Sequence, residues 1–379
     1  MGKKIITVIA SVLKPVDDTR MYEKLALSLQ QTNRYDVNII GFATKKPPIQ
    51  QKISFFPAFR FRSTSPKRIF ASLVFIKLLM SIKPALLIIC TYELLPIAIL
   101  YKLFSRECKL VYDVQENYAL NLRTNRGEGF LVNLFAKIIR LIEKLSQSYT
   151  ELSLLAEEGY FKEMPYLRHS LVLLNKYQPG LDEKNHPKKI GFEPHSNGGS
   201  IKILYCGTIS EVYGIYQSLD LIRSLKSKIP GLEARIIGHV TNDNLLKKLV
   251  AKYFEEYIQW DVALFPVPHQ DILDAIQQAD FGLVAHQPVE SIQNCFPTRI
   301  YEFMAFGLPF ILQDHSLWTD YASPWDCCII TDFNNFDIDD IVHQMKTRRF
   351  YSKGIPEDVY WNKEGKLLIA SIDKLFSHK

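Results

Sequence analysis

The sequence lacks the cysteine patterns that disulfide frameworks and zinc sites require. Its 379 residues include six cysteines, and none of them belongs to a C-x-x-C pair. This usage is typical of a reducing compartment, so we expect a cytoplasmic protein. The apolar stretch within residues 1–13 is too short for a good signal peptide, and we interpret it as a first buried strand.

Phosphate-binding fingerprints and metal motifs are also missing. No G-x-G-x-x-G follows the first expected strand and no Walker A loop is present, which argues against a dinucleotide dehydrogenase and an NTPase. No Asp-x-Asp motif stands on a suitable loop. The adjacent pairs Asp17–Asp18 and Asp339–Asp340 are expected to cap helices or to be solvated, so no metal cofactor is expected.

A membrane-spanning segment is not expected either. The most apolar window, residues 85–101, contains Glu93 and Pro96 and is a little short for a span. With 47% hydrophobic and 23% charged residues, the composition is that of a globular protein. A chain of 379 residues is too long for one ordinary core, so two domains are expected.

Positive charge is concentrated in one segment. The whole chain has a net charge of +6, yet residues 60–110 alone carry nine Lys and Arg against the two acids Glu93 and Glu107. The segment is also rich in Phe, Leu and Ile, which favours peripheral contact with an anionic membrane surface. A buried helix with solvated basic ends is the alternative. No stacking or recognition motif accompanies the charge, so we expect no nucleic-acid partner.

Short apolar runs and amphipathic stretches alternate along the chain, as in an α/β protein. Residues 176–200 interrupt this pattern, because they are rich in Lys, Pro, Gly, Asn and His, and we expect a linker there. The pattern predicts two doubly wound Rossmann-like domains that face a cleft, residues 1–175 and 201–355, and a final helix within residues 356–379. Strands are expected at residues 5–10, 36–42, 85–90, 109–113, 151–155, 171–174, 201–206, 233–237, 258–260, 281–285 and 310–312. Helices are expected at residues 67–81, 95–104, 130–147, 156–161, 215–226, 243–253, 269–278 and 362–376, before residue 29 and around Glu302.

Three polar clusters follow expected strands, at residues 14–20, 113–118 and 207–214. Ligands of doubly wound domains bind at the carboxyl ends of the strands, so these clusters are candidate sites. The third cluster reads GTISEVYG. Its backbone N–H groups and the following helix N-terminus can hold a diphosphate, and a plain strand-to-helix turn is the alternative. His239 and His286 also follow strands and are candidates for lining the cleft, but we expect them to be polar loop residues.

Residues 297–309, PTRIYEFMAFGLP, are the most informative stretch. A proline turn leads into a short helix whose one acid, Glu302, stands among apolar neighbours. A carboxylate accepts two charge-assisted hydrogen bonds from a sugar diol, so Glu302 is a candidate sugar-binding residue. An acid at a helix start that complements the macrodipole is the alternative.

Five stretches of the chain resemble GT-B glycosyltransferases of the large family-4 group. The similar stretches are PVDDTRMYEKLALSL, LVYDVQENY, ILYCGTISEVYG, FPVPHQDILDAIQQADFGLVAH and PTRIYEFMAFGLPFI, and they occur in the family's order. The last is similar to the family signature P-x-K-x-x-E-Y-M-A-x-G-L-P-V-I. The resemblance implies a retaining enzyme that uses a nucleotide sugar, with the final helix packed back on the N-terminal domain.

The resemblance also implies roles for individual residues. Glu302 would bind the ribose hydroxyls, and Arg299, at the place of the family's lysine, would neutralise the donor phosphates. These two and the Asp113 cluster residues Gln115 and Glu116 are the expected catalytic residues. The expected donor-binding residues are Gly207, Thr208, Asn294, Thr298, Arg299 and Glu302, and the expected acceptor-side residues are Asp18, Arg20, Asn117 and Tyr118.

The sequence departs from the family pattern at several of these positions. Thr208 and Tyr213 stand where many relatives have Arg and Lys, Asn294 stands at the place of an acid, and Gln115 replaces a histidine. We expect a glycosyltransferase that moves a sugar from a nucleotide sugar to a glycan or lipid-linked glycan of a surface polysaccharide, without a metal. The alternatives are a nucleotide-sugar epimerase or hydrolase on the same fold, and a degenerate, non-catalytic partner of an active transferase.

Overall fold

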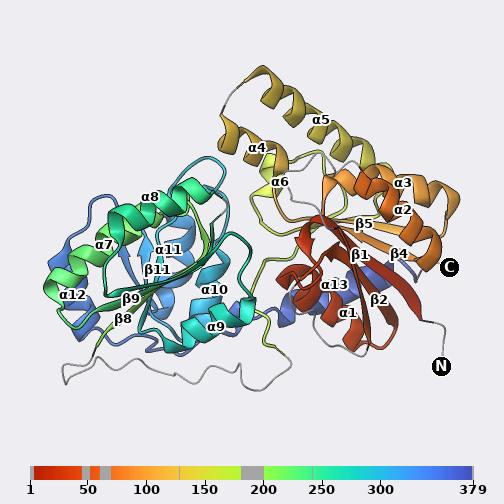
Figure 1. Cartoon of the computed structure of the whole chain (residues 1–379). Helices are drawn as coiled ribbons and strands as arrows, with labels where there is room; N and C mark the ends of the chain where they lie inside the picture. Colours follow the sequence, from red (N-terminus) through yellow and green to blue (C-terminus); the bar gives the residue numbers. More distant parts are fainter. Residues whose placement is uncertain are drawn as a thin grey trace. The chain divides into compact units, whose positions relative to one another are not determined.

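The computed structural model describes residues 4–44, 52–59, 70–127, 129–180, 200–240 and 242–377. The chain divides into two compact units (Figure 1). Unit 1 comprises Met1–Gln178 and Trp361–Lys379, and unit 2 comprises Pro179–Tyr360. The units therefore divide a few residues after the expected boundaries at 175 and 355. Most of the expected linker, residues 181–199, lies outside the described residues.

Unit 1 contains a seven-stranded parallel sheet. Its strands are nearly continuous apolar runs, because helices cover both faces of the sheet. The strands are β1 (Ile5–Pro15), β2 (Tyr35–Phe42), β3 (Ile53–Phe59), β4 (Leu86–Ile89), β5 (Lys109–Val114), β6 (Leu152–Leu155) and β7 (Ser170–Val172). They lie in the order β3-β2-β1-β4-β5-β6-β7.

The helices of unit 1 form two layers, one on each face of this sheet. Phe75 and Leu79 of one helix pack into the first core, and Leu368 and Ile372 of the final helix pack into the second. The first layer includes α2 (Ala71–Ile82), α3 (Leu95–Phe104), α4 (Tyr118–Arg126), α5 (Phe130–Ser146) and α6 (Tyr160–Glu163). The second includes the π-helical segment η1 (Thr19–Ala26), α1 (Leu27–Gln31) and α13 (Asn362–Lys374).

Unit 2 repeats this architecture around a six-stranded parallel sheet. Its strands are β8 (Lys202–Ile209), β9 (Glu233–Val240), β10 (Ile258–Ala263), β11 (Phe281–Val284), β12 (Phe310–Gln313) and β13 (Cys328–Thr331), in the order β10-β9-β8-β11-β12-β13. Its helices are α7 (Ile215–Lys228), α8 (Asp243–Tyr253), α9 (His269–Gln278), α10 (Thr298–Ala305), α11 (Ser316–Ala322) and α12 (Ile338–Thr347).

The order of the strands fixes where a ligand can bind in each unit. The chain fills one half of a sheet and then turns to the other, between β1 and β4 in unit 1 and between β8 and β11 in unit 2. Such a switch point leaves a crevice at the carboxyl ends of the two strands. In unit 2 the crevice is deepened, because β8 pairs with β9 along residues 202–209 but with β11 only at Ile203 and Leu204.

Several expectations need correction. Gly207 and Thr208 were expected in a loop, but β8 continues to Ile209 because its pairing with β9 does not stop at residue 206. The short helix expected at 156–161 is α6, which begins only at Tyr160. The sequence patterns missed β3, α4, α11, β13 and α12. The expected start of the helix at residue 67 lies outside the described residues.

No helix in the described part of the chain is both long enough and apolar enough to cross a membrane. All six cysteines are in the described part, and none forms a disulfide.

Candidate functional site

Arg299 and Glu302 form an ion pair on one face of α10, at the switch point of unit 2. A spacing of three residues places both side chains on the same side of the helix. Only 16% of the Arg299 side chain and 11% of the Glu302 side chain are exposed. Glu302 is the fifth residue of α10 and the first turn holds no acid, so the macrodipole alternative for Glu302 is wrong.

His269 completes this group from a different helix. It is the first residue of α9, directly after Pro268, and its Nε2 atom lies 3.1 Å from the Oε1 atom of Glu302. Glu302 therefore connects the starts of two helices through its two carboxylate oxygens. Burial lowers the pKa of Arg299, but Glu302, Cys206 and Tyr205 together raise it by more, so the net shift is upward and the guanidinium stays charged. The sequence patterns missed His269, although the resemblance stretch VPHQD contains it.

Two glycines allow the Arg299 guanidinium to lie against the backbone of β8. Gly207 has a φ of 109°, and a Cβ atom there would lie 3.0 Å from Nη2 and 3.1 Å from Nε of Arg299. Gly238 of β9 lies behind it, and a Cβ atom at Gly238 would clash with the carbonyl oxygen of Gly207. Only glycine fits both positions without displacing the backbone or the arginine.

Within the described residues, Arg299 has a single hydrogen-bond partner, Glu302, which it binds through Nη1. A guanidinium has five N–H donors. Arg299 therefore has further N–H donors beside the backbone of β8, and a guanidinium can bind a phosphate group through two such donors.

The loop after β8 is held against the end of β11. A Cβ atom at Gly214, whose φ is 75°, would clash with the carbonyl oxygen of Ala285. The ring of Tyr213 packs against the ring of His286, with centroids 4.8 Å apart. Burial, together with the neighbouring Arg299 charge, lowers the pKa of His286 to about 3, so this histidine is neutral near pH 7. Tyr213, which stands where many relatives have the lysine of the diphosphate loop, thus makes an aromatic contact.

The other expected donor-binding residues lie around the same helix start. Thr298 opens α10 and is half-buried, and Thr208 is the half-buried penultimate residue of β8. Asn294 is exposed in the turn that precedes α10. The structure therefore brings Gly207, Arg299 and Glu302 into one group, and the role of Asn294 stays a prediction.

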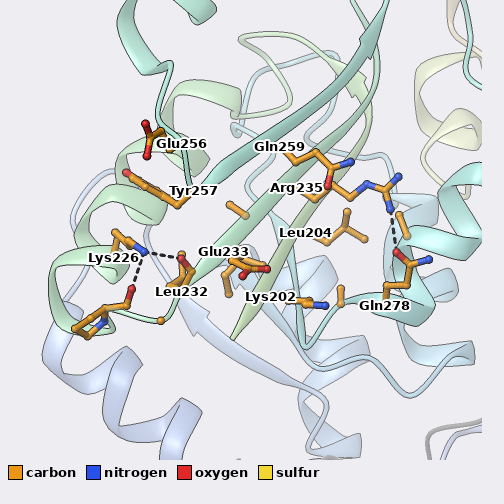
Figure 2. A pocket seen from close by; sticks show the side chains of 16 residues that line it. Lys202, Leu204, Lys226, Leu232, Glu233, Arg235, Glu256, Tyr257, Gln259 and Gln278 are labelled. Carbon is orange, nitrogen blue, oxygen red and sulfur yellow. Dashed lines mark hydrogen bonds between the residues drawn. The ribbon is translucent and has the colours of Figure 1, made fainter. Parts of the chain in front are cut away.

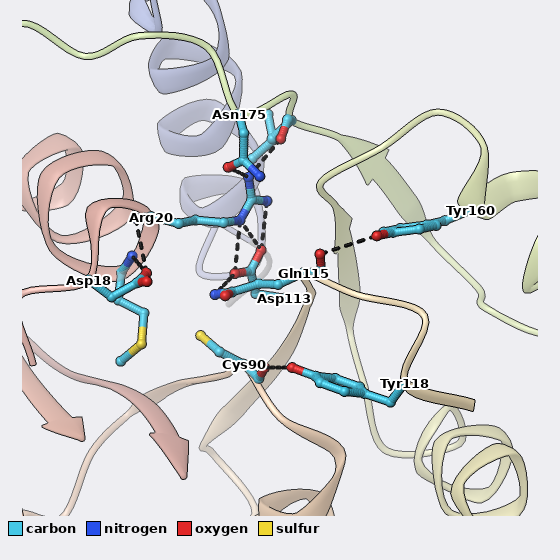
Figure 3. A network of polar contacts seen from close by, with 10 residues as sticks. Asp18, Arg20, Cys90, Asp113, Gln115, Tyr118, Tyr160 and Asn175 are labelled. Atoms are coloured by element: carbon cyan, nitrogen blue, oxygen red, sulfur yellow. Dashed lines mark hydrogen bonds and ion pairs between the residues drawn. The ribbon is translucent and has the colours of Figure 1, made fainter. Parts of the chain in front are cut away.

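In unit 1 the corresponding switch point contains a buried ion pair between Arg20 and Asp113 (Figure 3). The Nε atom of Arg20 lies 2.9 and 3.0 Å from the two carboxylate oxygens of Asp113, and Nη2 lies 2.7 Å from Oδ1. Nη1 donates to the carbonyl oxygen of Leu173 and to Oδ1 of Asn175, both at 2.8 Å. Gln115 donates to the other side of Asp113 at 2.8 Å. These bonds join η1, β5 and the segment after β7.

Asp18 and Asn117 act as helix caps. Asp18 accepts hydrogen bonds from the backbone N–H groups of Arg20 and Met21, both at 3.0 Å, and so begins η1. Asn117 accepts from the N–H group of Leu120 at 3.1 Å and begins α4. Their expected roles toward an acceptor stay predictions.

Glu116 and Tyr118 have different surroundings. Glu116 is bound by Lys14 at 3.1 Å, and 39% and 30% of these side chains are exposed. The Lys14 ammonium lowers the pKa of Glu116 below its usual value. Tyr118 is buried, and its hydroxyl donates to the carbonyl oxygen of Cys90 at 3.0 Å. Glu116 thus carries a partly exposed charge, whereas Arg20, Asn117 and Tyr118 are buried.

A surface depression of about 560 Å³ lies at the opposite edge of the unit 2 sheet (Figure 2). The amino-terminal ends of β8 and β9 line it, with Lys202, Leu232 and Glu233, and the amine of Lys226 bonds to two backbone carbonyls there. Ligands of doubly wound sheets bind at the carboxyl ends, so this depression is separate from the candidate site. Within the described residues, no group of three or more His, Cys, Asp or Glu side chains is placed to hold a metal ion.

A family model matches part of the chain, and solved structures share its fold. Residues 188–352 match the family model described as Glycosyl transferases group 1. Sucrose-phosphate synthase from Thermosynechococcus elongatus has a similar structure, with a TM-score of 0.68 and 12% identity over 99% of this chain and 100% of that chain. No curated protein matches the chain in sequence.

Other solved structures share the fold. Anabaena HepE in complex with UDP-glucose has a TM-score of 0.66 and 12% identity over 98% of this chain and 100% of that chain. WaaG, a glycosyltransferase involved in lipopolysaccharide biosynthesis, has a TM-score of 0.62 and 11% identity over 97% of this chain and 95% of that chain. Two UDP-sugar 2-epimerases match with lower TM-scores of 0.60 and 0.56.

These findings define the class of the protein. Two doubly wound units in this order, with whole-chain structural matches, make it a member of the GT-B fold class. Residues 188–352, which lie in unit 2, match the Glycosyl transferases group 1 model, so this part of the chain is similar to the glycosyltransferases of that family.

Proposed function

We propose that the protein transfers a sugar from a nucleotide-sugar donor to a glycan or lipid-linked glycan acceptor on the cytoplasmic side of a membrane. The observation that carries this proposal is the group formed by Gly207, Arg299, Glu302 and His269 at the switch point of unit 2. HepE, which shares the fold, has been solved with UDP-glucose. The involvement of WaaG in lipopolysaccharide biosynthesis supports a surface glycan as the product.

Each group of the site has a separate task in the proposed reaction. Glu302 accepts hydrogen bonds from the ribose hydroxyls, and His269 and Arg299 fix its orientation. Arg299 directs its remaining N–H donors at the diphosphate beside the Gly207 backbone. As the bond from the anomeric carbon to the diphosphate oxygen breaks, negative charge builds on the leaving group, and one well-placed charge is worth about 3 kcal/mol of barrier. We propose transfer without a metal, because Arg299 provides this charge, and with retention of configuration, which the family resemblance implies.

Unit 1 is the proposed acceptor side. The Lys14–Glu116 pair is its exposed charged group near the carboxyl ends of β1 and β5. Membrane contact through residues 60–110 is part of the same proposal. In the described part of that segment, Lys77, Lys83 and Arg106 are exposed.

Because epimerases share the fold, the first alternative function is that of an epimerase or hydrolase. The second alternative is a non-catalytic partner of an active transferase. Product analysis separates them. A transferase forms a glycosylated product only when an acceptor is present, whereas a hydrolase or epimerase consumes the nucleotide sugar alone. A non-catalytic partner binds nucleotide sugars or nothing and forms no product under either condition.

Thermal stabilisation by a panel of nucleotides and nucleotide sugars, followed by calorimetry, tests the donor site. We expect a nucleotide sugar to stabilise the wild type, and Glu302→Ala to abolish measurable donor binding while the circular dichroism spectrum is unchanged. Glu256→Ala is the matched control, because Glu256 is an exposed acid at the opposite edge of the same sheet. Donor affinity that is the same in Glu302→Ala as in the wild type would refute the proposed role.

A further inference from the structure

The outer surface of unit 1 carries an apolar stripe that no described part of the chain covers. It runs along α5, where seven large apolar side chains are at least 41% exposed. Their spacing keeps them on one side of the helix over about 23 Å, at a rise of 1.5 Å per residue. We call them the α5 stripe: Phe130, Leu131, Leu134, Phe135, Ile138, Leu141 and Leu145.

The exposure of the α5 stripe does not result from loose packing of the helix. The opposite side of α5 is firmly held, since Ala136 and Ile139 lie in a buried cluster with residues of α4. Glu143, the one acid of α5, is fully buried and accepts hydrogen bonds from the hydroxyls of Tyr112 at 2.7 Å and Tyr166 at 2.6 Å. These contacts fix the rotation of α5, and so they fix the stripe on the outside.

Three cations border the stripe, of which Lys137 and Lys144 are exposed and Arg140 is half-buried, and α5 itself has no exposed acid. Lys137, Arg140 and Lys144 follow one another at intervals of three and four residues, so they share the flank of α5 beside the stripe. Since Glu143 is buried, α5 presents apolar and positive groups to its surroundings. This is the pattern of a helix that lies in the plane of an anionic membrane interface.

Neighbouring helices extend the surface. α3 packs against α5, and α2 packs against α3. Both helices leave large apolar side chains exposed, and neither contains an acid. The exposed residues are Leu73, Val74 and Met80 of α2 and Leu100, Leu103 and Phe104 of α3. Surfaces of this size and composition mark interaction sites.

We propose that the α5 stripe, with the exposed faces of α2 and α3, docks unit 1 on an anionic lipid bilayer. A second copy of the chain fits less well, because an interface between two copies would bring the same patch to face itself. Lys137, Arg140 and Lys144 would then meet like charges, whereas anionic headgroups complement them. This proposal does not depend on the chemistry of unit 2.

Flotation of the full-length protein with vesicles tests the proposal. The vesicles are phosphatidylcholine alone, or phosphatidylcholine partly replaced by phosphatidylglycerol. We expect the protein to float with the anionic vesicles at low salt and less at high salt, because salt screens the lysine and arginine charges. Failure to float with anionic vesicles at low salt would overturn the proposal.

Two double variants separate the apolar and electrostatic contributions. Leu131→Glu with Phe135→Glu is expected to lower partitioning at least about tenfold, because two carboxylates replace side chains that enter the interface. Lys137→Gln with Lys144→Gln is expected to lower it about 30-fold at low salt and to remove most of the salt dependence. Matched controls are Phe254→Glu and Lys247→Gln with Lys248→Gln, which change exposed residues of unit 2 and should float like the wild type.

Two further outcomes of these experiments would contradict the proposal. If the apolar variant floats as the wild type does, the stripe is not the docking surface. The proposal is also wrong if the wild type does not bind vesicles and is a dimer by light scattering, and the variants are monomers. In that case the surface joins two copies of the chain. Nucleotide-dependent thermal stabilisation, measured on the same samples, is expected to be unchanged, so failure of docking and failure of the donor site are distinguishable.

Discussion

Each unit places a buried arginine–carboxylate pair at its switch point, but the two pairs are constructed differently. Arg20 of unit 1 makes five hydrogen bonds to Asp113, Leu173 and Asn175. Arg299 of unit 2 has one partner among the described residues, Glu302. Arg20 uses four of its five N–H donors within the protein, which indicates a structural role. Within the part of the chain that the structure describes, Arg299 uses one, so further donors are left for the ligand that we propose.

The largest expected effect is on the stability of unit 1. Arg20→Ala leaves the Asp113 carboxylate buried without its partner, and we expect the free energy of unfolding to fall by about 3–5 kcal/mol. Calorimetric melting measures the loss. Arg34→Ala is the control, because Arg34 forms its ion pair with Asp373 while 54% exposed, and such a pair is worth about 0–1 kcal/mol. Equal losses in the two variants would contradict a structural role for Arg20.

The next effect belongs to the reaction. Arg299→Gln removes the charge that is expected to face the diphosphate, so we predict a fall in the rate of transfer equivalent to about 3 kcal/mol, or on the order of 100-fold. The melting temperature should change much less than in Arg20→Ala. Steady-state kinetics with the donor found by the nucleotide panel measures the rate. Arg223→Gln, at a partly exposed arginine of α7, is the control. If Arg299→Gln lowered the melting temperature as much as Arg20→Ala does, the proposed difference between the two arginine–carboxylate pairs would be wrong.

Gly207 sharpens the contrast further. Gly207→Ala introduces backbone strain of about 1–2 kcal/mol and pushes on the Arg299 guanidinium. Gly354→Ala is a matched control, since Gly354 also has a positive φ, 78°, but a Cβ atom there meets nothing within 4 Å. We expect similar losses of melting temperature in both variants and weaker donor binding by calorimetry only in Gly207→Ala. Donor binding weakened equally in both would mean that the Arg299 contact is unimportant.

Much of the fold follows from local sequence patterns. Continuous apolar runs such as Leu86–Ile89 and Phe281–Val284 indicate buried parallel strands, and the structure contains them as β4 and β11. β3 was missed because it is an edge strand with Pro57 and exposed positions, which weaken the pattern. β8 was predicted too short, because its last residues are ordered by pairing with His239 and Val240, which local sequence does not show.

The candidate site was predictable only in part, for a similar reason. Arg299 and Glu302 are three residues apart, so their pairing is visible in the sequence. His269 lies 33 residues before Glu302, and Asp113 lies 93 residues after Arg20. Contacts over such distances are made by the tertiary fold. The sequence therefore indicated which side chains are chemically suited to a site, but not which of them form structural contacts within the protein.

The smallest expected effect concerns the second basic group beside Arg299. Burial keeps the pKa of His286 at about 3 in the folded protein, below its ordinary value of 6.5. Above pH 6.5 the ring is neutral in both states. As the pH falls from 6.5 toward 3, the unfolded chain binds a proton at this position and the folded protein does not, so stability is lost. His286→Asn removes this contribution, and its melting temperature should fall less steeply than that of the wild type between pH 6.5 and pH 4. His343→Asn, at an exposed position of α12, is the control and should keep the slope of the wild type. An unchanged slope in His286→Asn would mean that His286 takes up a proton in the folded state, and Arg299 would then share its charge at this site with a second cation.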